Sequence, residues 1–461
     1  MNHHKEISRK VVLIVTVITA FLTTFTSSCM ELSIPHMEAD FHVSATAIGW
    51  VLTSYTLTTA ALSVPFGRLA DIKGRRGILL LGIAGYAGAS ILCCVSISFP
   101  MLLIGRVVQG IFGSMLFGTN NAILISVYPP EMRGKVLGIS VSSTYIGLAA
   151  GPVLGGLLNQ HIGWRSIFVA SAVIAIVAFV SALKHTPYSK PIEQEGKADI
   201  AGNVLYVGAL VVALYGLANL TTMSSAKLIL IVGIVLAVLF VLVERKAEVP
   251  VIKITMFSKN KYFTYSNLAA LLNYAATFAI SYLLSIYLQV VKGYGSQTAG
   301  LIMVCQPLVM AILTPKMGKT SDKVAPSKMA SAGMAVCALA LFFMTWVGIE
   351  TPVWVVMGIL ALAGFSFSLF SSPNTNAVLA MVDKEDYAVT NSILATMRTI
   401  GQTLSMAIVT IIVGHILGNI ALAESTPQQL VKVMHYSFIV FMVLCIVGVF
   451  LSVQRIERRC N

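Results

Sequence analysis

Charged residues are scarce in this sequence. Only 11% of the 461 residues are Asp, Glu, Lys or Arg, whereas a soluble domain usually carries about 25%. Apolar residues make up 57%, and they form runs of roughly 20 residues, long enough to cross a bilayer, along the whole chain. A water-soluble core of this size would need helices with polar faces, which most of these runs lack. The sequence therefore predicts an all-α polytopic membrane protein with almost no soluble domain.

The residues and motifs that enzymes and metal sites need are also missing. The seven Cys are scattered, and the one adjacent pair, Cys93 and Cys94, has poor geometry for chelation on a helix. We expect small apolar packing from these cysteines instead. The eight His lie mainly in loops, tails or span ends, and no H-E-x-x-H or G-x-S-x-G string is present. We therefore expect no enzyme, no metal site and no cofactor.

Fourteen apolar spans are expected, with ends that are accurate to a few residues. They cover residues 11–35, 46–69, 77–97, 100–126, 135–159, 163–183, 200–220, 226–243, 262–290, 296–315, 328–348, 352–380, 387–417 and 433–453. The first run is long and lacks an A-x-A-like cleavage site, so we expect a retained helix and not a signal peptide.

The 31 Lys and Arg residues divide unevenly between the two sides that these spans define. Twenty-five lie on the side that holds both termini, and Arg106 and Arg398 lie inside spans. By the positive-inside rule, both termini are expected in the cytoplasm of a multi-pass protein of the cell membrane. The net charge of +13 then follows from topology and attraction to lipid, and no nucleic-acid partner is expected. The other side has four: Arg165, Lys227, Lys292 and Lys432.

A short charged turn separates the second and third spans. It contains Gly67, Asp71, Gly74, Arg75 and Arg76. An acid at a helix end, a glycine and a basic cluster can form an electrostatic latch at a membrane surface. The alternative is a solvated turn that only sets topology, but such a turn would need neither Asp71 nor Gly67. We therefore predict that these five residues form a gating latch.

A second copy of this turn indicates a duplicated bundle. Gly318-x-x-x-Asp322 follows a later span, with lysines around it but without the G-R-R ending. We predict an N-terminal six-helix bundle over 1–184 and a C-terminal six-helix bundle over 262–461. A linker with two extra transmembrane helices joins them over 185–261. These two helices carry little polarity, so we expect them to brace the bundles against lipid.

Two arginines lie inside spans. A charge there is costly and usually faces the protein interior or a water-filled cavity. Arg106 belongs to an R-x-x-Q-G string with Gln109, and the alternative for it is a side chain that snorkels to the interface. Arg398 could be a counter-charge to a carboxylate or an anionic substrate, or a structural tie to backbone carbonyls, and the two readings are evenly balanced.

The fifth span contains a string of small residues, G-x-x-x-G-P-x-x-G-G. It consists of Gly147, Gly151, Pro152, Gly155 and Gly156. Small residues four apart let helices approach closely, and Pro152 can bend its helix. Ordinary packing explains the glycines but not the whole string.

These patterns, in this order, resemble motifs of the major facilitator superfamily. The Gly67 turn resembles the signature loop between helices two and three. R-x-x-Q-G at Arg106 resembles the fourth-helix motif, which is linked there to proton transfer and cavity structure, and the fifth-span string resembles the antiporter motif of drug:proton exchangers. With fourteen spans and an R-x-x-G at Arg398, the chain resembles the fourteen-span drug:proton antiporter branch. The resemblance implies two six-helix major-facilitator bundles plus two extra central helices.

Glu31 is the acid of most interest. Of the 18 acids, it is the only one that we place within a span and away from a cytoplasmic junction. A carboxyl at the edge of a cavity could bind and release a proton. The alternative is a position at the outer water interface, because Pro35 follows four residues later. The resembling branch commonly has an Asp where this chain has Thr26. The candidates for proton coupling are therefore Glu31, Arg106 and Arg398.

Polar and aromatic side chains inside spans suit a cavity for amphipathic compounds. Each one singly is also explained by a hydrogen bond between helices. The candidates for lining the cavity are Thr26, Tyr55, Gln109, Asn120, Tyr145, Asn273, Tyr274 and Asn374.

The sequence thus predicts a proton-coupled secondary exporter that works by alternating access. It would exchange protons for drugs or other amphipathic small molecules, as in multidrug efflux, with the proton gradient as its energy source. The alternative is a dedicated exporter of one metabolite, lipid or peptide, because a fold does not fix a substrate. We expect a monomer whose partners are a small-molecule substrate, protons and the lipid bilayer.

Overall fold

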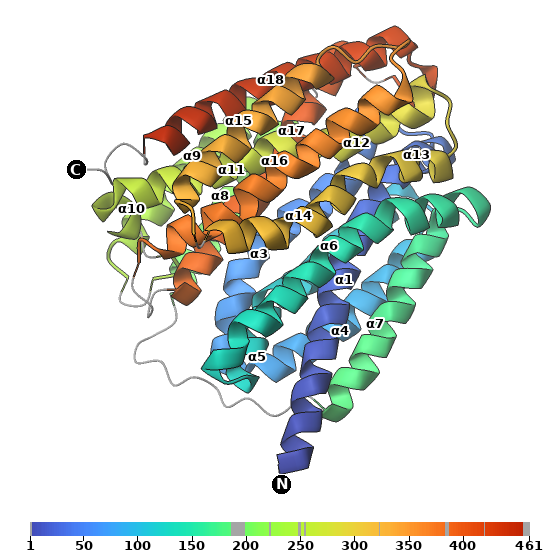
Figure 1. Cartoon of the computed structure of the whole chain (residues 1–461). Helices are drawn as coiled ribbons and strands as arrows, with labels where there is room; N and C mark the ends of the chain where they lie inside the picture. The colour runs from blue at the N-terminus through green and yellow to red at the C-terminus, as the bar shows by residue number, and fades with distance from the viewer. Residues whose placement is uncertain are drawn as a thin grey trace. The chain divides into compact units, whose positions relative to one another are not determined.

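The computed structural model is built of helices joined by loops (Figure 1). It describes residues 2–185, 199–220, 223–247, 250–252, 255–321, 323–382, 387–418 and 420–454. The helices within these ranges are α1 (Asn2–Phe41), α2 (Ala45–Ile48), α3 (Trp50–Lys73), α4 (Arg75–Cys94), α5 (Phe99–Val127), α6 (Pro130–His161), α7 (Arg165–His185), α8 (Ile200–Ala218), α9 (Ala226–Glu244), α10 (Thr255–Lys259), α11 (Lys261–Thr277), α12 (Ala279–Ile286), the π-helix η1 (Tyr287–Val291), α13 (Ser296–Met303), α14 (Cys305–Ser321), α15 (Pro326–Met344), α16 (Val353–Leu379), α17 (Tyr387–Ile416), the 3-10 helix η3 (Leu422–Glu424) and α18 (Pro427–Val453).

The predicted number of membrane spans is confirmed. Within the described ranges, fourteen helical segments are long and apolar enough to cross a membrane. The first differs most from its predicted extent, because it runs over Arg9–Phe41 and passes through Pro35. A proline removes one backbone hydrogen bond, but a membrane helix tolerates this where neighbouring helices cover the freed carbonyl. Its presence was therefore not enough to end the helix.

The turns between helices follow from local chemistry. Gly74 separates α3 from α4 with a φ of 99°, a region that residues with a Cβ rarely adopt. Gly163 has the same φ between α6 and α7. Before α5, the Ser98 side chain accepts a hydrogen bond from the Met101 backbone N–H, which caps the helix start. These turns fix where the spans begin and end.

The chain divides into two compact units. Unit 1 consists of Met1–Val43, Trp50–Lys197 and the short segment Gly295–Leu301. Unit 2 consists of Ser44–Gly49, Ala198–Tyr294 and Ile302–Asn461.

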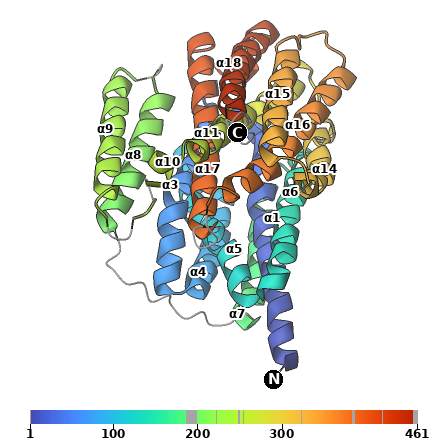
Figure 2. The same cartoon turned by 60° about the vertical axis from the view of Figure 1, so that its left-hand side comes forward.

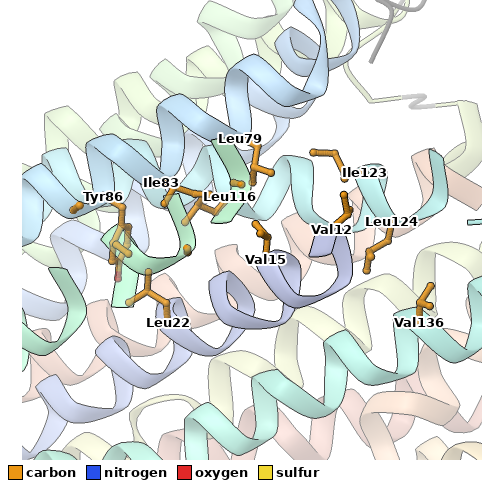
Figure 3. Packing of buried hydrophobic residues seen from close by; sticks show 14 of the residues in the cluster. Val12, Val15, Leu22, Leu79, Ile83, Tyr86, Leu116, Ile123, Leu124 and Val136 are labelled. Atoms are coloured by element: carbon orange, nitrogen blue, oxygen red, sulfur yellow. The ribbon is translucent and has the colours of Figure 1, made fainter. Parts of the chain in front are cut away.

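In unit 1, α1 packs against α6 and α7, α3 and α4 pack against α5, and α4 packs against α7. Aliphatic side chains fill the space between these helices (Figure 3). Tyr86 closes one end of this cluster, where it lies near Leu22. The labelled aliphatic members are Val12, Val15, Leu22, Leu79, Ile83, Leu116, Ile123, Leu124 and Val136.

In unit 2, α11 packs against α17 and α18, and α16 packs against α14 and α15. The helices α8 and α9 form a pair of their own, side by side in Figure 2. Only 11% of the most apolar stretch of α9 is buried inside protein. A helix that is apolar on all sides and so little covered is suited to contact lipid.

The α8–α9 pair depends on small residues where the two backbones approach. A methyl group at Gly233 would lie 2.3 Å from the Ala213 backbone nitrogen. We therefore expect Gly233→Ala to destabilise the protein by about 1–3 kcal/mol through overpacking. Gly208→Ala on α8 is the matched control, because its new methyl would lie 3.7 Å from Leu236. The melting temperature of purified protein checks this, and equal melting of both variants would contradict it.

Candidate functional site

A buried arginine holds three helices of unit 1 together. Arg106 on α5 is 0% exposed. Its Nε donates a hydrogen bond to the Val51 carbonyl oxygen on α3 at 2.9 Å, and its Nη1 donates to Gln109 Oε1. Gln109 Nε2 then donates to Ser90 Oγ on α4 at 2.9 Å. The R-x-x-Q-G string therefore forms one continuous polar network, and the snorkelling alternative for Arg106 is excluded by this burial.

This cation has no acidic partner in the described part of the chain. The guanidinium carbon lies 4.5 Å from the centre of the Tyr55 ring, a cation–π contact that gains strength away from water. Its Nη2 is buried and has no hydrogen-bond partner among the described atoms. Buried N–H groups rarely stay unpaired. The network therefore has one donor to spare for an oxygen acceptor such as a water molecule.

Near the Arg106 network, α1 carries the hydroxyl groups of Thr19 and Thr26 and no acidic side chain at these two positions. Thr26 is 1% exposed, donates to the Leu22 carbonyl oxygen and lies 2.8 Å from Ser171 Oγ. Two turns earlier on this side, Thr19 Oγ1 donates to Asn120 Oδ1 at 3.0 Å. Both candidates for the cavity, Thr26 and Asn120, thus have partners within the bundle, the alternative stated for single polar residues.

Glu31 lies on α1 and is 7% exposed, so this residue is covered by protein and does not face open water. It has an interaction partner. Because α1 continues to Phe41, a further acid on this helix, Glu38, is also buried, at 2% exposed. Seven residues separate the two acids, which places them two turns apart on one side of the helix. The sequence reasoning missed Glu38 because it ended the span at Pro35.

The glycines of the fifth-span string set the distance between α1 and α6. Methyl groups added at three of them would lie 2.4 Å from Thr24, 2.5 Å from Ser28 and 2.7 Å from Cys29. Contacts this short cannot be accommodated without moving a helix. The three glycines are Gly147, Gly151 and Gly155.

The same helix also meets the start of α13. A methyl group at Gly156 would lie 2.5 Å from the Ser296 carbonyl oxygen, and one at Gly300 would lie 1.9 Å from the Pro152 carbonyl oxygen. The Asn159 amide nitrogen donates to Ser296 Oγ at 2.8 Å and lies 3.1 Å from His36 Nδ1. Sequence reasoning missed this polar contact, since no local pattern connects these positions.

The Gly67 turn has the predicted compact form, but its role as a latch stays a prediction. Gly67 packs against Gly118, whose added methyl would lie 2.9 Å from Gly67 Cα. Arg75 Nη1 donates to the Ala122 carbonyl oxygen at 2.9 Å, and Arg76 Nη2 donates to the Leu183 carbonyl oxygen at 3.1 Å. Both arginines thus hold helix ends within unit 1. The side chain of Asp71 lies outside the described residues, as does Asp322 in the second copy of the turn.

In unit 2, the predicted candidates gather where α11 faces α17. The guanidinium carbon of Arg398 lies 5.4 Å from the centre of the Tyr274 ring, and this ring packs edge-on against Phe367 at 5.6 Å. Asn273, next in the chain, is 0% exposed, and neither polar atom of its amide has a hydrogen-bond partner among the described atoms.

The remaining candidates are less informative. Asn374 Nδ2 donates a long hydrogen bond of 3.4 Å to the Ser266 carbonyl oxygen. Tyr145 is 8% exposed and has a partner. Among the residues that the structure describes, no three His, Cys, Asp or Glu side chains are placed to hold a metal ion.

Comparison with known proteins agrees with this architecture. A family model described as the Major Facilitator Superfamily matches residues 16–405 and 266–459. The riboflavin transporter RibZ of Clostridioides difficile (strain 630) is 29% identical over 446 residues, 96% of each chain. The methylenomycin A resistance protein of Bacillus subtilis (strain 168) is 26% identical over 408 residues, 87% of each chain. Both relatives match the chain along most of their length.

A solved structure of a peptide transporter POT in complex with sulfate has a TM-score of 0.72 at 14% identity, and the match covers 96% of this chain and 94% of that one. This likeness shows the fold alone, and it confirms the predicted fold class. The predictions of a transporter and not an enzyme, and of a multi-pass membrane protein, are confirmed as well. Since the family model matches more than half of its length, the chain belongs to the Major Facilitator Superfamily.

Proposed function

We propose that this chain is a proton-coupled secondary exporter of drugs or other amphipathic small molecules. The observation that carries the proposal is the burial of Glu31 on α1, the helix that the glycines of α6 hold at close range. An ionisable group inside a membrane protein is costly and is kept where it serves transport or proton transfer. Two relatives support the proposal, since one is named a riboflavin transporter and the other a methylenomycin A resistance protein.

The proposed coupling rests on the cost of a buried charge. A carboxyl that faces protein or lipid is stable when protonated, and it can ionise when water or a cation reaches it. Glu31 would take up a proton from the outer side and release it to the cytoplasm as the two six-helix bundles alternate around a central site. Outward movement of substrate then draws on the inward proton gradient.

Arg106 and Arg398 supply fixed charges in this scheme. The Arg106 network joins α3, α4 and α5 through Val51, Gln109 and Ser90, and its spare N–H suits an oxygen acceptor. Arg398 stacks on Tyr274 beside Asn273, a combination of charge, ring and amide that suits an amphipathic compound with one polar end. We propose that Arg398 with Tyr274 receives the polar end of the substrate, and that the Arg106 network keeps α3, α4 and α5 in register.

The proposal extends to gating and topology. We place both termini in the cytoplasm from the distribution of Lys and Arg. The Gly67 turn then lies on the cytoplasmic side, where its Asp and Arg residues would act as the latch. The arginine contacts to carbonyl oxygens of Ala122 and Leu183 support a rigid turn that could transmit helix movement. We propose that the working unit is a monomer.

A dedicated exporter of one metabolite is the second candidate. The match to a relative named a riboflavin transporter extends over 96% of both chains, so the same scaffold is compatible with a single dedicated substrate. The two candidates differ in substrate range and not in mechanism.

The first experiment measures substrate-evoked proton flux. Purified protein in proteoliposomes with an internal pH dye would receive cationic dyes, tetracyclines, quinolones, neutral amphiphiles and riboflavin in turn. We expect flux with several unrelated compounds, because an adaptable amphipathic site does not select one structure. Flux with riboflavin alone would establish the dedicated exporter. Absence of flux with every compound would contradict the multidrug antiporter and would favour a dedicated substrate outside the panel or another coupling ion.

Neutralising the proposed proton carrier provides a second test. We expect Glu31→Gln to abolish substrate-evoked proton flux, since an amide cannot take up and release a proton, while the variant keeps its elution profile and melting temperature. Glu38→Gln tests the second buried acid of α1 in the same assay. Full gradient-driven export by Glu31→Gln would show that Glu31 is not the carrier, and loss of flux only in Glu38→Gln would transfer the role to Glu38.

Widening the gap between α1 and α6 should slow transport. A methyl group at Gly151 would lie 2.5 Å from Ser28 Cβ, and we expect Gly151→Ala to cost about 1–3 kcal/mol. If this cost falls on the transport step, the rate falls by about fivefold to about 150-fold. Gly138→Ala is the control on the same helix, because its new methyl would meet no atom within 4 Å. Equal transport rates for the two variants would show that this close approach is not needed.

A further inference from the structure

A surface pocket of unit 2 has no lining residue in common with the groups that the proposed transport cycle uses. It is formed by the loop from α15 to α16 and by the first turns of α18, and its volume is about 490 Å³. Trp346, Glu350, Gln428, Lys432 and His435 are among its lining residues. The distribution of Lys and Arg assigns this loop to the outer side of the membrane.

The backbone of the loop is fastened on several sides. His435 Nε2 lies 2.7 Å from the Val347 carbonyl oxygen, and Tyr287 Oη donates to the Gly348 carbonyl oxygen at 2.8 Å. Lys292 Nζ donates to the Ile349 carbonyl oxygen. Side chains from α18 and from the two ends of η1 thus hold the loop, so the pocket exists before any ligand arrives, which lowers the entropic cost of binding.

The pocket is lined by one acidic and one basic side chain that form no ion pair with each other among the described residues. Glu350 and Lys432 are both exposed. Lys432 Nζ lies 6.0 Å from the centre of the Tyr436 ring. A ligand with both a negative and a positive group at short separation would complement this arrangement.

The surroundings mark the boundary between lipid and water. The pocket lies just beyond Met344, where the span Pro326–Met344 ends. Trp346 is 74% exposed, and its ring lies 6.0 Å from that of Phe342, which is also exposed. Exposed aromatic rings at the end of a span typically lie at the level of the lipid headgroups.

The lysines here are not explained by topology. Only four Lys and Arg are assigned to the outer side by the predicted spans. One of them, Lys432, lines this pocket, and a second, Lys292, contacts the backbone of its loop. A positive charge on the outer side opposes the usual bias, so a binding role is the more economical reason for its presence.

We propose that this pocket binds the headgroup of a zwitterionic phospholipid of the outer leaflet. Lys432 and Gln428 receive the phosphate, and Glu350 with the Trp346 ring receives the ammonium group. The acyl chains then lie along the apolar surface of α15 that carries Phe342. The proposal concerns a lipid ligand and stands whether or not the transport substrate is the one proposed above.

The test compares lipids by native mass spectrometry of the purified full chain. Phosphatidylethanolamine and phosphatidylglycerol of equal chain length are titrated onto delipidated protein. We expect Lys432→Gln and Glu350→Gln each to weaken phosphatidylethanolamine binding by about tenfold or more, as for loss of one charged hydrogen-bond partner. Lys227→Gln, at another exposed lysine assigned to the outer side, is the control and should leave binding unchanged.

Three outcomes would overturn the proposal. Equal affinity for phosphatidylglycerol would remove the role of Glu350 and the ammonium group, and unchanged binding in both variants would place the lipid elsewhere. Soluble phosphoethanolamine that competes at the same concentration as the lipid would show that a free headgroup compound and not a membrane lipid is the ligand. Melting temperatures of all variants, measured beside the titrations, separate loss of binding from loss of fold.

Discussion

The close approach of α1 to α6 is the constraint on which unit 1 depends. Lipid chains are as apolar as the side chains that face them, so helices in a membrane associate mainly through close packing and hydrogen bonds between helices. At Gly147 and Gly151 the backbones come near enough for side chains to reach across. Thr24 Oγ1 donates to the Thr144 carbonyl oxygen at 3.2 Å, and Ser143 Oγ donates to the Val17 carbonyl oxygen at 2.7 Å. The glycines therefore fix the position of α1, and with it the depth of its buried acids.

The Arg106 network applies the same principle to a charge. No carboxylate neutralises the guanidinium among the described residues, and its stabilisation comes from a backbone oxygen, an amide oxygen and the face of Tyr55. Neutral partners are effective here because a low local dielectric strengthens each hydrogen bond and penalises each one that is missing. The arrangement keeps a permanent cation beside three helices without consuming an acid that proton transfer would need.

The sequence was sufficient to predict the helical fold, the number of spans and the tight turn at Gly74, because apolar runs and glycine act locally. It also identified Arg106 with Gln109, since a charge inside a span is conspicuous. It did not predict that Arg106 bonds to Val51, because Val51 contributes only its backbone carbonyl oxygen. Every residue type has this oxygen, so no sequence pattern marks the position. Nor did it predict that Asn159 meets Ser296, which lies in a distant part of the chain, or that Glu38 is buried, since Pro35 was taken to end the helix. Local pattern thus identified the unusual residues, and tertiary packing decided what they touch.

The spacing of Glu31 and Glu38 has a consequence for the electrical balance of transport. The guanidinium of Arg106 stays protonated throughout any physiological cycle, so of the three proposed coupling residues and Glu38, the carboxyls are the groups that would change the number of protons carried in the proposed exchange. One titrating carboxyl that exchanges one proton for one monovalent cation moves no net charge across the membrane. Two carboxyls on the same helix, each carrying a proton, would move one net positive charge inward for each such cation exported. The membrane potential, worth about 2.3 kcal/mol per charge at 100 mV, would then add to the pH gradient in driving export.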